Sequence, residues 1–378
     1  MKYYLIAGEA SGDLHGSNLM KGLMQEDQNA NFRFFGGDLM QAQGGVLVKH
    51  YRDMAFMAVI RVLLNFRTVV KNFRHCKRDI QDFNPDVLIL IDFAGFNLRI
   101  ARYAKQIGIR VFYYISPKVW AWHSSRVKTI KALVDKMFVI FPFEVEFYKT
   151  HEFEVEYLGN PTLDAIDEKI NSKPDRNVFI QKNQLDDKPI VAILAGSRKQ
   201  EIDLCLPEML GVIPDYPDYQ FIIAGAPGIP KEYYDKYIRN HPVHLVYNST
   251  YDLLNVADAA VVTSGTATLE TALMMVPEIV CYKTGALTYF VGWHIVRIRP
   301  TYFSLVNLIM NQEVVKEFLQ FNLKEDISAE LGRILNDNVY RDKMIDNFRN
   351  LRNRLGNPGG SQRIAKRIVE LICQDLQA

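Results

Sequence analysis

Short runs of apolar residues alternate with amphipathic segments along most of the chain. Apolar runs of this length are typical of parallel strands that are buried on both faces. The runs that predict strands lie at 3–6, 86–92, 110–115 and 137–141, and then at 190–194, 220–224, 244–246, 259–262 and 278–282. The segments between them predict helices on both faces of each sheet. We therefore predict an α/β protein of two Rossmann-like halves in tandem, facing a central cleft.

A loss of this alternation marks the predicted domain boundary. Residues 169–188 are polar and charged, and a proline lies within this stretch. Such a composition is typical of a connecting segment. We therefore expect a first domain at 1–168, a linker at 169–188 and a second domain at 189–350.

The last segment, 351–378, follows the second domain and is predicted to contain a separate C-terminal helix. The sequence Asn357-Pro358-Gly359-Gly360 interrupts any preceding helix, because proline and glycine both disfavour helical continuation. Serine is a good N-terminal helix cap, so we expect Ser361 to cap a final helix that ends near Gln374.

Composition and charge exclude several classes of protein. The 378-residue chain has 48% hydrophobic residues and a formal net charge of +2, which does not favour nucleic acid as a partner. Its four cysteines lie far apart in sequence, a pattern that favours a reducing cytoplasm. No apolar run approaches the roughly 18 residues of a transmembrane helix, and no signal-peptide pattern occurs. We expect a cytoplasmic protein.

The first predicted strand leads into a turn of small residues, Ile6–Gly16. A strand, a small-residue turn and a helix in this order are typical of a nucleotide- or sugar-binding α/β domain. Glycine at position 8 lets the backbone approach a ligand, Glu9 lies at the end of the strand, and Ser11 is a plausible helix cap. The alternative is an ordinary tight connection in which Glu9 caps the helix or forms a salt bridge.

A second turn of this kind, Gly196-Ser197-Arg198, follows the first strand of the second half. An arginine in such a turn suits an anionic ligand, because the guanidinium binds phosphate through two hydrogen bonds. We predict that Arg198 contacts a phosphate. The alternative is a surface loop in which Arg198 pairs with Glu201.

A third turn, Ser264-Gly265-Thr266, follows the strand at 259–262 and opens a helix. Backbone N–H groups at a helix start stabilise a diphosphate without a metal. Glu270 lies about one turn further on and is placed to accept hydrogen bonds from ribose hydroxyls. The alternative is a capped helix in which Glu270 interacts only with the helix dipole.

Asp92 ends the most apolar strand of the first half. A carboxylate at the carboxyl end of a strand is a candidate general base, and partial burial would raise its pKa and make it a better base. The alternative is a structural cap for a helix that starts near Asn97. The chain contains no Asp-x-Asp triplet and no His/Cys cluster with metal-ligand spacing, so we expect no metal and no cofactor.

The stretch Met54–Arg78 combines apolar and basic residues, with no acidic residue between Asp53 and Asp79. This composition is typical of a helix lying on an anionic membrane surface. The alternative is one or two core helices with a basic solvent face. We assign to the acceptor or membrane surface Phe56, Ile60, Leu63, Leu64, Phe66, Arg67, Lys71 and Arg74.

Several motifs occur together in a specific order: Ala7–Asp13, Ser116–Trp122, Gly196–Arg198, Ser264–Glu270, Ser304–Leu308 and Glu317–Gln320. On these motifs, nearly the whole chain resembles the lipid A disaccharide synthase family. The resemblance implies a GT-B fold and an inverting, metal-independent glycosyl transfer. The implied donor is UDP-2,3-diacylglucosamine and the acceptor is 2,3-diacylglucosamine 1-phosphate (lipid X). The products would be the β-1′,6-linked disaccharide 1-phosphate and UDP.

The resemblance also implies roles for single residues. Asp92 matches the suspected base, and the other active-site matches are Glu9, Arg198, Glu270, Asn307 and Gln320. We place Ser11 and Trp120 on the acceptor side. The family associates peripherally with the inner membrane through the region that matches Met54–Arg78, and its members can exchange C-terminal segments, so a monomer or a homodimer is expected.

Two departures from the family pattern stand out. Many members carry a second acidic residue where this chain has Gly95, and many carry proline where it has Val306. Any role of that second carboxylate is therefore absent from this chain. Because Val306 replaces the proline, the resemblance does not determine the pose of Asn307. Two other functions fit the same motifs less well: a GT-B-type UDP-sugar epimerase and a non-catalytic protein that binds a nucleotide or a lipid.

Overall fold

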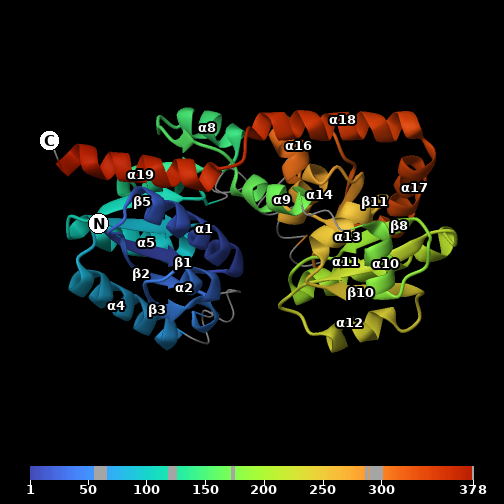
Figure 1. Cartoon of the computed structure of the whole chain (residues 1–378), viewed down its shortest axis with the longest axis horizontal. Helices are drawn as coiled ribbons and strands as arrows, with labels where there is room; N and C mark the ends of the chain where they lie inside the picture. The colour runs from blue at the N-terminus through green and yellow to red at the C-terminus, as the bar shows by residue number, and fades with distance from the viewer. Residues whose placement is uncertain (55–65, 118–125, 172–174, 286–288, 290–300, 377–378) are drawn as a thin grey trace. The chain divides into compact units, whose positions relative to one another are not determined.

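The computed structural model describes residues 1–378 apart from 55–65, 118–125, 172–174, 286–288, 290–300 and 377–378. Its internal contacts divide the chain, shown in Figure 1, into two compact units. One unit comprises Met1–Asp164 together with Asn357–Ala378, and the other comprises Ala165–Gly356. Each unit contains its own sheet, and all of the described strand pairs are parallel.

The first unit is built on a seven-stranded sheet with the order β3-β2-β1-β4-β5-β6-β7. Its strands are β1 (Lys2–Ala7), β2 (Asn31–Gly36), β3 (Val46–His50), β4 (Val87–Ile91), β5 (Arg110–Tyr114), β6 (Lys136–Val139) and β7 (Glu156–Tyr157). Its described helices are α1 (Ala10–Glu26), α2 (Asp38–Ala42), η1 (Tyr51–Asp53), α4 (Phe66–Phe83), α5 (Ala94–Gln106), α7 (Arg126–Leu133), α8 (Pro142–Lys149) and α19 (Gly360–Leu376). Helix α9 (Pro161–Asn171) crosses the boundary between the units.

Helices cover both faces of this sheet, because successive residues of a strand point to opposite sides. Tyr4 of β1 belongs to a core that includes residues of α4, α5 and α7, whereas Tyr3 belongs to a core with α1 and α19. In Figure 1, α19 runs beside α1. Gly22 allows this close packing, since a Cβ there would lie 2.8 Å from the Cβ of Ala365.

The start of α19 is capped from another part of the chain. The Asp164 carboxylate accepts hydrogen bonds from the backbone N–H groups of Gly359 (2.6 Å), Gly360 (3.2 Å) and Ser361 (3.1 Å). The Ser361 hydroxyl is buried and has no hydrogen-bond partner in the described part of the chain. The prediction that Ser361 caps this helix is therefore wrong, because a carboxylate brought in by α9 satisfies the same N–H groups.

The second unit contains a six-stranded sheet with the order β10-β9-β8-β11-β12-β13. Its strands are β8 (Ile190–Leu194), β9 (Gln220–Gly225), β10 (Val243–Tyr247), β11 (Ala259–Thr263), β12 (Glu278–Tyr282) and β13 (Glu317–Leu319). Its other described helices are α10 (Arg176–Asn183), α11 (Lys199–Leu210), η2 (Ile213–Asp215), α12 (Lys231–Ile238), α13 (Thr250–Val256), α14 (Thr266–Leu273), α16 (Leu305–Met310), α17 (Leu323–Asn336) and α18 (Asn338–Leu355).

All of the apolar runs named above form strands, so the α/β prediction is confirmed, and β8 and β12 have the predicted bounds. Four short strands, β2, β3, β7 and β13, were not predicted. The stretch predicted as a linker, 169–188, contains the end of α9 and all of α10. Arg176 donates hydrogen bonds to the carbonyl oxygens of Val256 (2.9 Å) and Lys188 (2.8 Å), which attaches α10 to the second unit.

Candidate active site

Two candidate carboxylates of the first unit follow adjacent strands. Glu9 comes after β1 and Asp92 directly after β4, and these strands pair in parallel with Ala7 opposite Ile91. Strand β1 has β2 on one side and β4 on the other, so the order in which strands are added to the sheet reverses here. Open α/β sheets bind ligands at such a switch point, outside the carboxyl ends of the strands. The structure thus brings Glu9 and Asp92 to one edge of the sheet.

The loops that carry these carboxylates lie against each other. A Cβ at Gly8 would fall 2.3 Å from ring atoms of Phe93, so the Phe93 ring covers the Gly8 backbone. Only glycine fits at this position without a shift. Asp92 and Phe93 both have left-handed backbones, with φ of +44° and +51°. Non-glycine residues in this region are uncommon and concentrate at functional sites.

The helix after the first loop begins earlier than predicted. Glu9 is the N-cap residue of α1, its side chain makes no capping hydrogen bond, and Ser11 lies exposed in the first turn. The prediction of Ser11 as the cap is therefore wrong. Asp13, which the sequence analysis did not select, is buried and accepts hydrogen bonds from the backbone N–H groups of Gly37 (2.7 Å) and Met40 (3.1 Å). It attaches α1 to the start of α2.

The second unit has an equivalent switch point between β8 and β11, which pair in parallel and lead to the two predicted phosphate loops. Arg198 is the N-cap residue of α11, and its guanidinium forms an ion pair with Glu201 at 3.0 Å. Glu201 also accepts hydrogen bonds from the backbone N–H groups of Ser197 (3.0 Å) and Arg198 (3.2 Å). The pairing anticipated as the alternative is therefore present, yet the Arg198 side chain remains 60% exposed.

The second loop of this unit opens α14. Gly265 is its N-cap residue, Thr266 is exposed in the first turn, and the Ser264 hydroxyl donates a hydrogen bond to the Phe303 carbonyl at 3.0 Å. The first N–H groups of a helix have no partner inside the helix. The loop therefore presents N–H donors and the positive end of a helix dipole at the carboxyl edge of the sheet.

Glu270 lies in the second turn of the same helix. Burial raises its pKa above the usual 4.5, and interaction with the Tyr251 hydroxyl on α13 opposes that shift. Burial and the nearby Glu270 carboxylate in turn raise the pKa of Tyr251. Tyr251 was not selected from the sequence, because nothing local indicates that α13 and α14 place these two side chains together.

Two further predicted site residues use their side chains internally. Asn307 is fully buried, and its amide accepts from the backbone N–H of Val314 and Val315 and donates to the Val315 carbonyl and the Glu317 carboxylate. The Gln320 amide accepts from the N–H of Thr284 (3.1 Å) and donates to its carbonyl (3.0 Å). Both amides therefore hold loops of the second unit in place.

The described part of the predicted membrane stretch forms α4. Val69, Cys76 and Ile80 are buried in the core of the first unit, whereas Lys71 and Arg74 are exposed. Within α4 the observed arrangement is therefore a core helix with a basic solvent face. The predicted residues outside the described residues are Phe56, Ile60, Leu63, Leu64 and Trp120, and the side chains of Phe66 and Arg67 are also not described.

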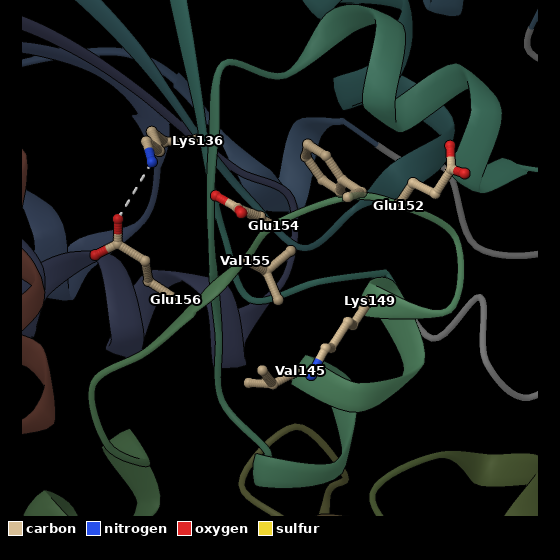
Figure 2. A pocket seen from close by; sticks show the side chains of 8 residues that line it. Lys136, Val145, Lys149, Glu152, Glu154, Val155 and Glu156 are labelled. Atoms are coloured by element: carbon tan, nitrogen blue, oxygen red, sulfur yellow. Dashed lines mark ion pairs between the residues drawn. The ribbon is translucent and has the colours of Figure 1, made fainter.

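A pocket of about 500 Å³ opens elsewhere in the first unit, beside α8, β6 and β7. Figure 2 shows Lys136, Lys149 and Glu156 at its wall, with an ion pair of 3.4 Å between Lys136 and Glu156. Lys136 begins β6, so this pocket lies beside the amino end of that strand, whereas Glu9 and Asp92 follow the carboxyl ends of theirs. It is separate from the candidate site.

No helix in the parts of the chain that the structure describes is long and apolar enough to cross a membrane. Nor do the His, Cys, Asp and Glu residues in those parts of the chain come together in groups of three that could hold a metal ion.

Solved structures share this fold. A UDP-GlcNAc 2-epimerase from Methanocaldococcus jannaschii, in complex with UDP-GlcNAc and UDP, matches with a TM-score of 0.66 and 16% identity over 98% of this chain and 100% of its own. The glycotransferase of kitacinnamycin matches with a TM-score of 0.63 and 12% identity, over 98% of this chain and 99% of its own. The two Rossmann-like units define the GT-B class of fold, as predicted.

Sequence comparison is more specific. The family profile described as Lipid-A-disaccharide synthetase matches residues 3–363. A lipid-A-disaccharide synthase from Geobacter metallireducens is 37% identical over 97% of this chain and 96% of its own, and one from Coxiella burnetii is 34% identical over 97% and 98%. The chain therefore belongs to the lipid-A-disaccharide synthase family of glycosyltransferases, which confirms the resemblance.

Proposed function

We propose that this chain transfers the diacylglucosaminyl group of UDP-2,3-diacylglucosamine to the 6-hydroxyl of 2,3-diacylglucosamine 1-phosphate, with inversion and without a metal. The observation that carries the proposal is the family match over residues 3–363. The carboxylates Glu9 and Asp92 at strand ends of the first unit support it. The helix start at Ser264–Thr266 and the exposed Arg198 in the second unit support it as well. The products are the β-1′,6-linked disaccharide 1-phosphate and UDP.

The proposed donor site lies in the second unit. The diphosphate of the UDP-sugar interacts with the helix start at Ser264–Thr266 and with Arg198. The ribose of the UDP-sugar interacts with Glu270. The exposed guanidinium of Arg198 supports this role, since the ion pair with Glu201 uses only one of its nitrogens. A guanidinium has five N–H donors, so several remain for a phosphate. Asn307 and Gln320 hold the surrounding loops.

The proposed acceptor site lies in the first unit, beside Asp92 and Glu9. As the acceptor oxygen forms its bond to the anomeric carbon, Asp92 takes the proton of that hydroxyl. The bond from the anomeric carbon to the diphosphate oxygen breaks on the opposite face, and UDP leaves with the electron pair. Arg198 and the N–H groups of α14 stabilise the charge that develops on this leaving group.

Both proposed substrates carry acyl chains, which remain in a membrane when the sugars react. The exposed face of α4 carries Lys71 and Arg74, and each basic residue near an anionic surface contributes about 1 kcal/mol of attraction. We propose that this face lies on the anionic inner membrane, with the chain associated peripherally.

The direct test is to incubate the purified protein in detergent with both lipids and EDTA, and to identify the products by mass spectrometry. Disaccharide 1-phosphate and UDP in equal amounts are the expected result. UDP without disaccharide would indicate another acceptor. UDP-sugar isomerised at its 2-position would indicate an epimerase, and binding of UDP without turnover would indicate a non-catalytic protein.

The role of Asp92 has its own test. Asp92→Asn keeps the size of the side chain but removes the base, which usually lowers the rate about 10²–10⁴-fold. UDP binding, measured by calorimetry, should stay unchanged. Asp342→Asn makes the same change of charge at an exposed position on α18 and should retain full activity. Near-normal turnover of Asp92→Asn would show that Asp92 is not the base.

A further inference from the structure

The backbone carbonyl of Asp92 accepts two side-chain hydrogen bonds inside the first unit. One comes from the amide nitrogen Nδ2 of Asn97 at 2.7 Å, and the other from the hydroxyl of Tyr113. Asn97 and Tyr113 are both fully buried. A carbonyl oxygen has two lone pairs, so these two donors are sufficient to occupy both.

These hydrogen bonds act on an unusual backbone. The chain leaves β4 with two consecutive non-glycine residues, Asp92 and Phe93, in the left-handed region. Residues other than glycine seldom adopt this conformation, although aspartate does so more readily than phenylalanine. It persists only where surrounding contacts over-determine it.

The other contacts of this turn come from the strand ladder and from α5. The Asp92 N–H donates to the Tyr114 carbonyl at 3.2 Å, which continues the pairing of β4 with β5. The Asn97 amide also lies within 3.2 Å of the Ile91 carbonyl and 3.5 Å of the Ile6 carbonyl, so one side chain connects the ends of β4 and β1. The backbone N–H and carbonyl of Asp92 are therefore held from two elements, β5 and α5.

We propose that Asn97 and Tyr113 are positioning residues for Asp92: by holding its carbonyl, they fix the backbone from which the carboxylate projects. Nothing in the sequence motif around Asp92 indicates Tyr113, which lies on the next strand. The proposal rests on the proposed role of Asp92 as the base. It adds that the rate depends on a buried hydroxyl which need not touch either substrate.

The chemistry of Tyr113 suits a permanent donor. Burial and the negative charge of Asp92 raise the pKa of Tyr113 well above its usual 10.0. The phenol therefore stays protonated at neutral pH and can donate its hydrogen bond throughout.

The chain offers a matched control on the same strand. Tyr114 is also fully buried, but it belongs to the core on the opposite face of the sheet, where its hydroxyl lies near Ser361. Tyr113→Phe and Tyr114→Phe each remove one buried hydroxyl from adjacent positions of β5. Only the first removes a hydrogen bond to Asp92.

The experiment compares kcat and KM of the two variants in the detergent assay. A base displaced by about 1 Å can lose on the order of 10²-fold in rate, so Tyr113→Phe should lower kcat roughly 10- to 100-fold. KM for both lipids should stay within about twofold of the parent, because substrate contacts remain. Tyr114→Phe should keep the parent kcat. Equal kcat for both variants would overturn the proposal.

Two further variants separate the possible outcomes. In the Asp92→Asn background, Tyr113→Phe should have no further effect, because residues that act as one unit are not additive. A full second loss there would show that Tyr113 does not act through Asp92 and would overturn the proposal. Asn97→Ala removes the other donor and repeats the test if Tyr113→Phe does not fold. Normal turnover of Asp92→Asn would instead refute the base, whereas failure of the parent protein to form the disaccharide would refute the proposed function.

Discussion

A buried carboxyl group in the second unit makes stability depend on pH in a calculable way. Glu278, the first residue of β12, is fully buried, and neither carboxyl oxygen has a hydrogen-bond partner in the described part of the chain. Burial, and then the negative charge of Glu317, raise its pKa well above the usual 4.5. The folded protein therefore holds a proton on Glu278 at pH values where the unfolded chain has released it.

The sign and size of the effect follow from proton linkage. Above pH 4.5 the folded state binds more protons than the unfolded state, so the free energy of unfolding falls as the pH rises. The fall is about 1.4 kcal/mol per pH unit until the folded pKa is reached. Between pH 5.5 and 7.5 this amounts to about 2.7 kcal/mol while the folded protein keeps the proton.

The perturbation is Glu278→Gln, which keeps the shape but removes the titration. Relative to the parent, the variant should gain stability as the pH rises, by up to about 1.4 kcal/mol for each pH unit below the folded pKa of Glu278. The buried amide of the variant can also change the free energy of unfolding by an amount that does not depend on pH. Such a change does not alter how the stability difference varies with pH. Glu325→Gln, at an exposed position on α17, removes the same charge without burial and should show no such slope.

The assay is urea unfolding followed by circular dichroism at pH 5.5, 6.5 and 7.5, with the three proteins measured in parallel. Two units can unfold separately, so two transitions are fitted wherever two are seen. A stability difference between Glu278→Gln and the parent that does not change with pH would refute the reasoning. It would mean that Glu278 ionises in the folded protein much as it does in the unfolded chain.

Two other predictions concern binding. Arg198→Ala should weaken UDP binding about 10- to 100-fold by calorimetry, since a hydrogen bond to a charged group contributes about 1.5–3 kcal/mol; an unchanged Kd would remove Arg198 from the donor site. Lys71→Glu with Arg74→Glu should reduce sedimentation with anionic vesicles, whereas the same reversal at exposed Lys182 and Lys343 should not. Equal sedimentation of both double variants would contradict the membrane role of α4.

Much of the architecture could be predicted from the sequence because it depends on local patterns. The continuous apolar runs of β8 and β12 identify buried strands without knowledge of their neighbours. The small-residue turns after β8 and β11 are likewise recognised locally, because each stands between a predicted strand and a predicted helix. The loops at Gly196–Arg198 and Ser264–Thr266 could therefore be selected as candidate sites. Such signals lie within a few consecutive residues.

Helix caps show where local reasoning fails. Ser361 has the right residue type for a cap, but Asp164, nearly two hundred positions away in sequence, satisfies the same N–H groups. Residue type alone cannot show which distant carboxylate folding will bring to a helix start. The Ser11 prediction failed for a related reason, since the helix begins at Ala10 and places Ser11 in its first turn.

The candidate site divides in the same way. The α/β class, most strands and the placement of Glu9, Asp92 and Arg198 at strand ends follow from patterns in the residues alone. Packing between distant elements was needed to show that Asn97 and Tyr113 both hold the Asp92 carbonyl and that Tyr251 interacts with Glu270. It also showed that the Glu278 carboxyl is buried without a hydrogen-bond partner among the described residues. Strand and helix signals are periodic along the chain, whereas these contacts depend on strand order and register, which join residues from different elements.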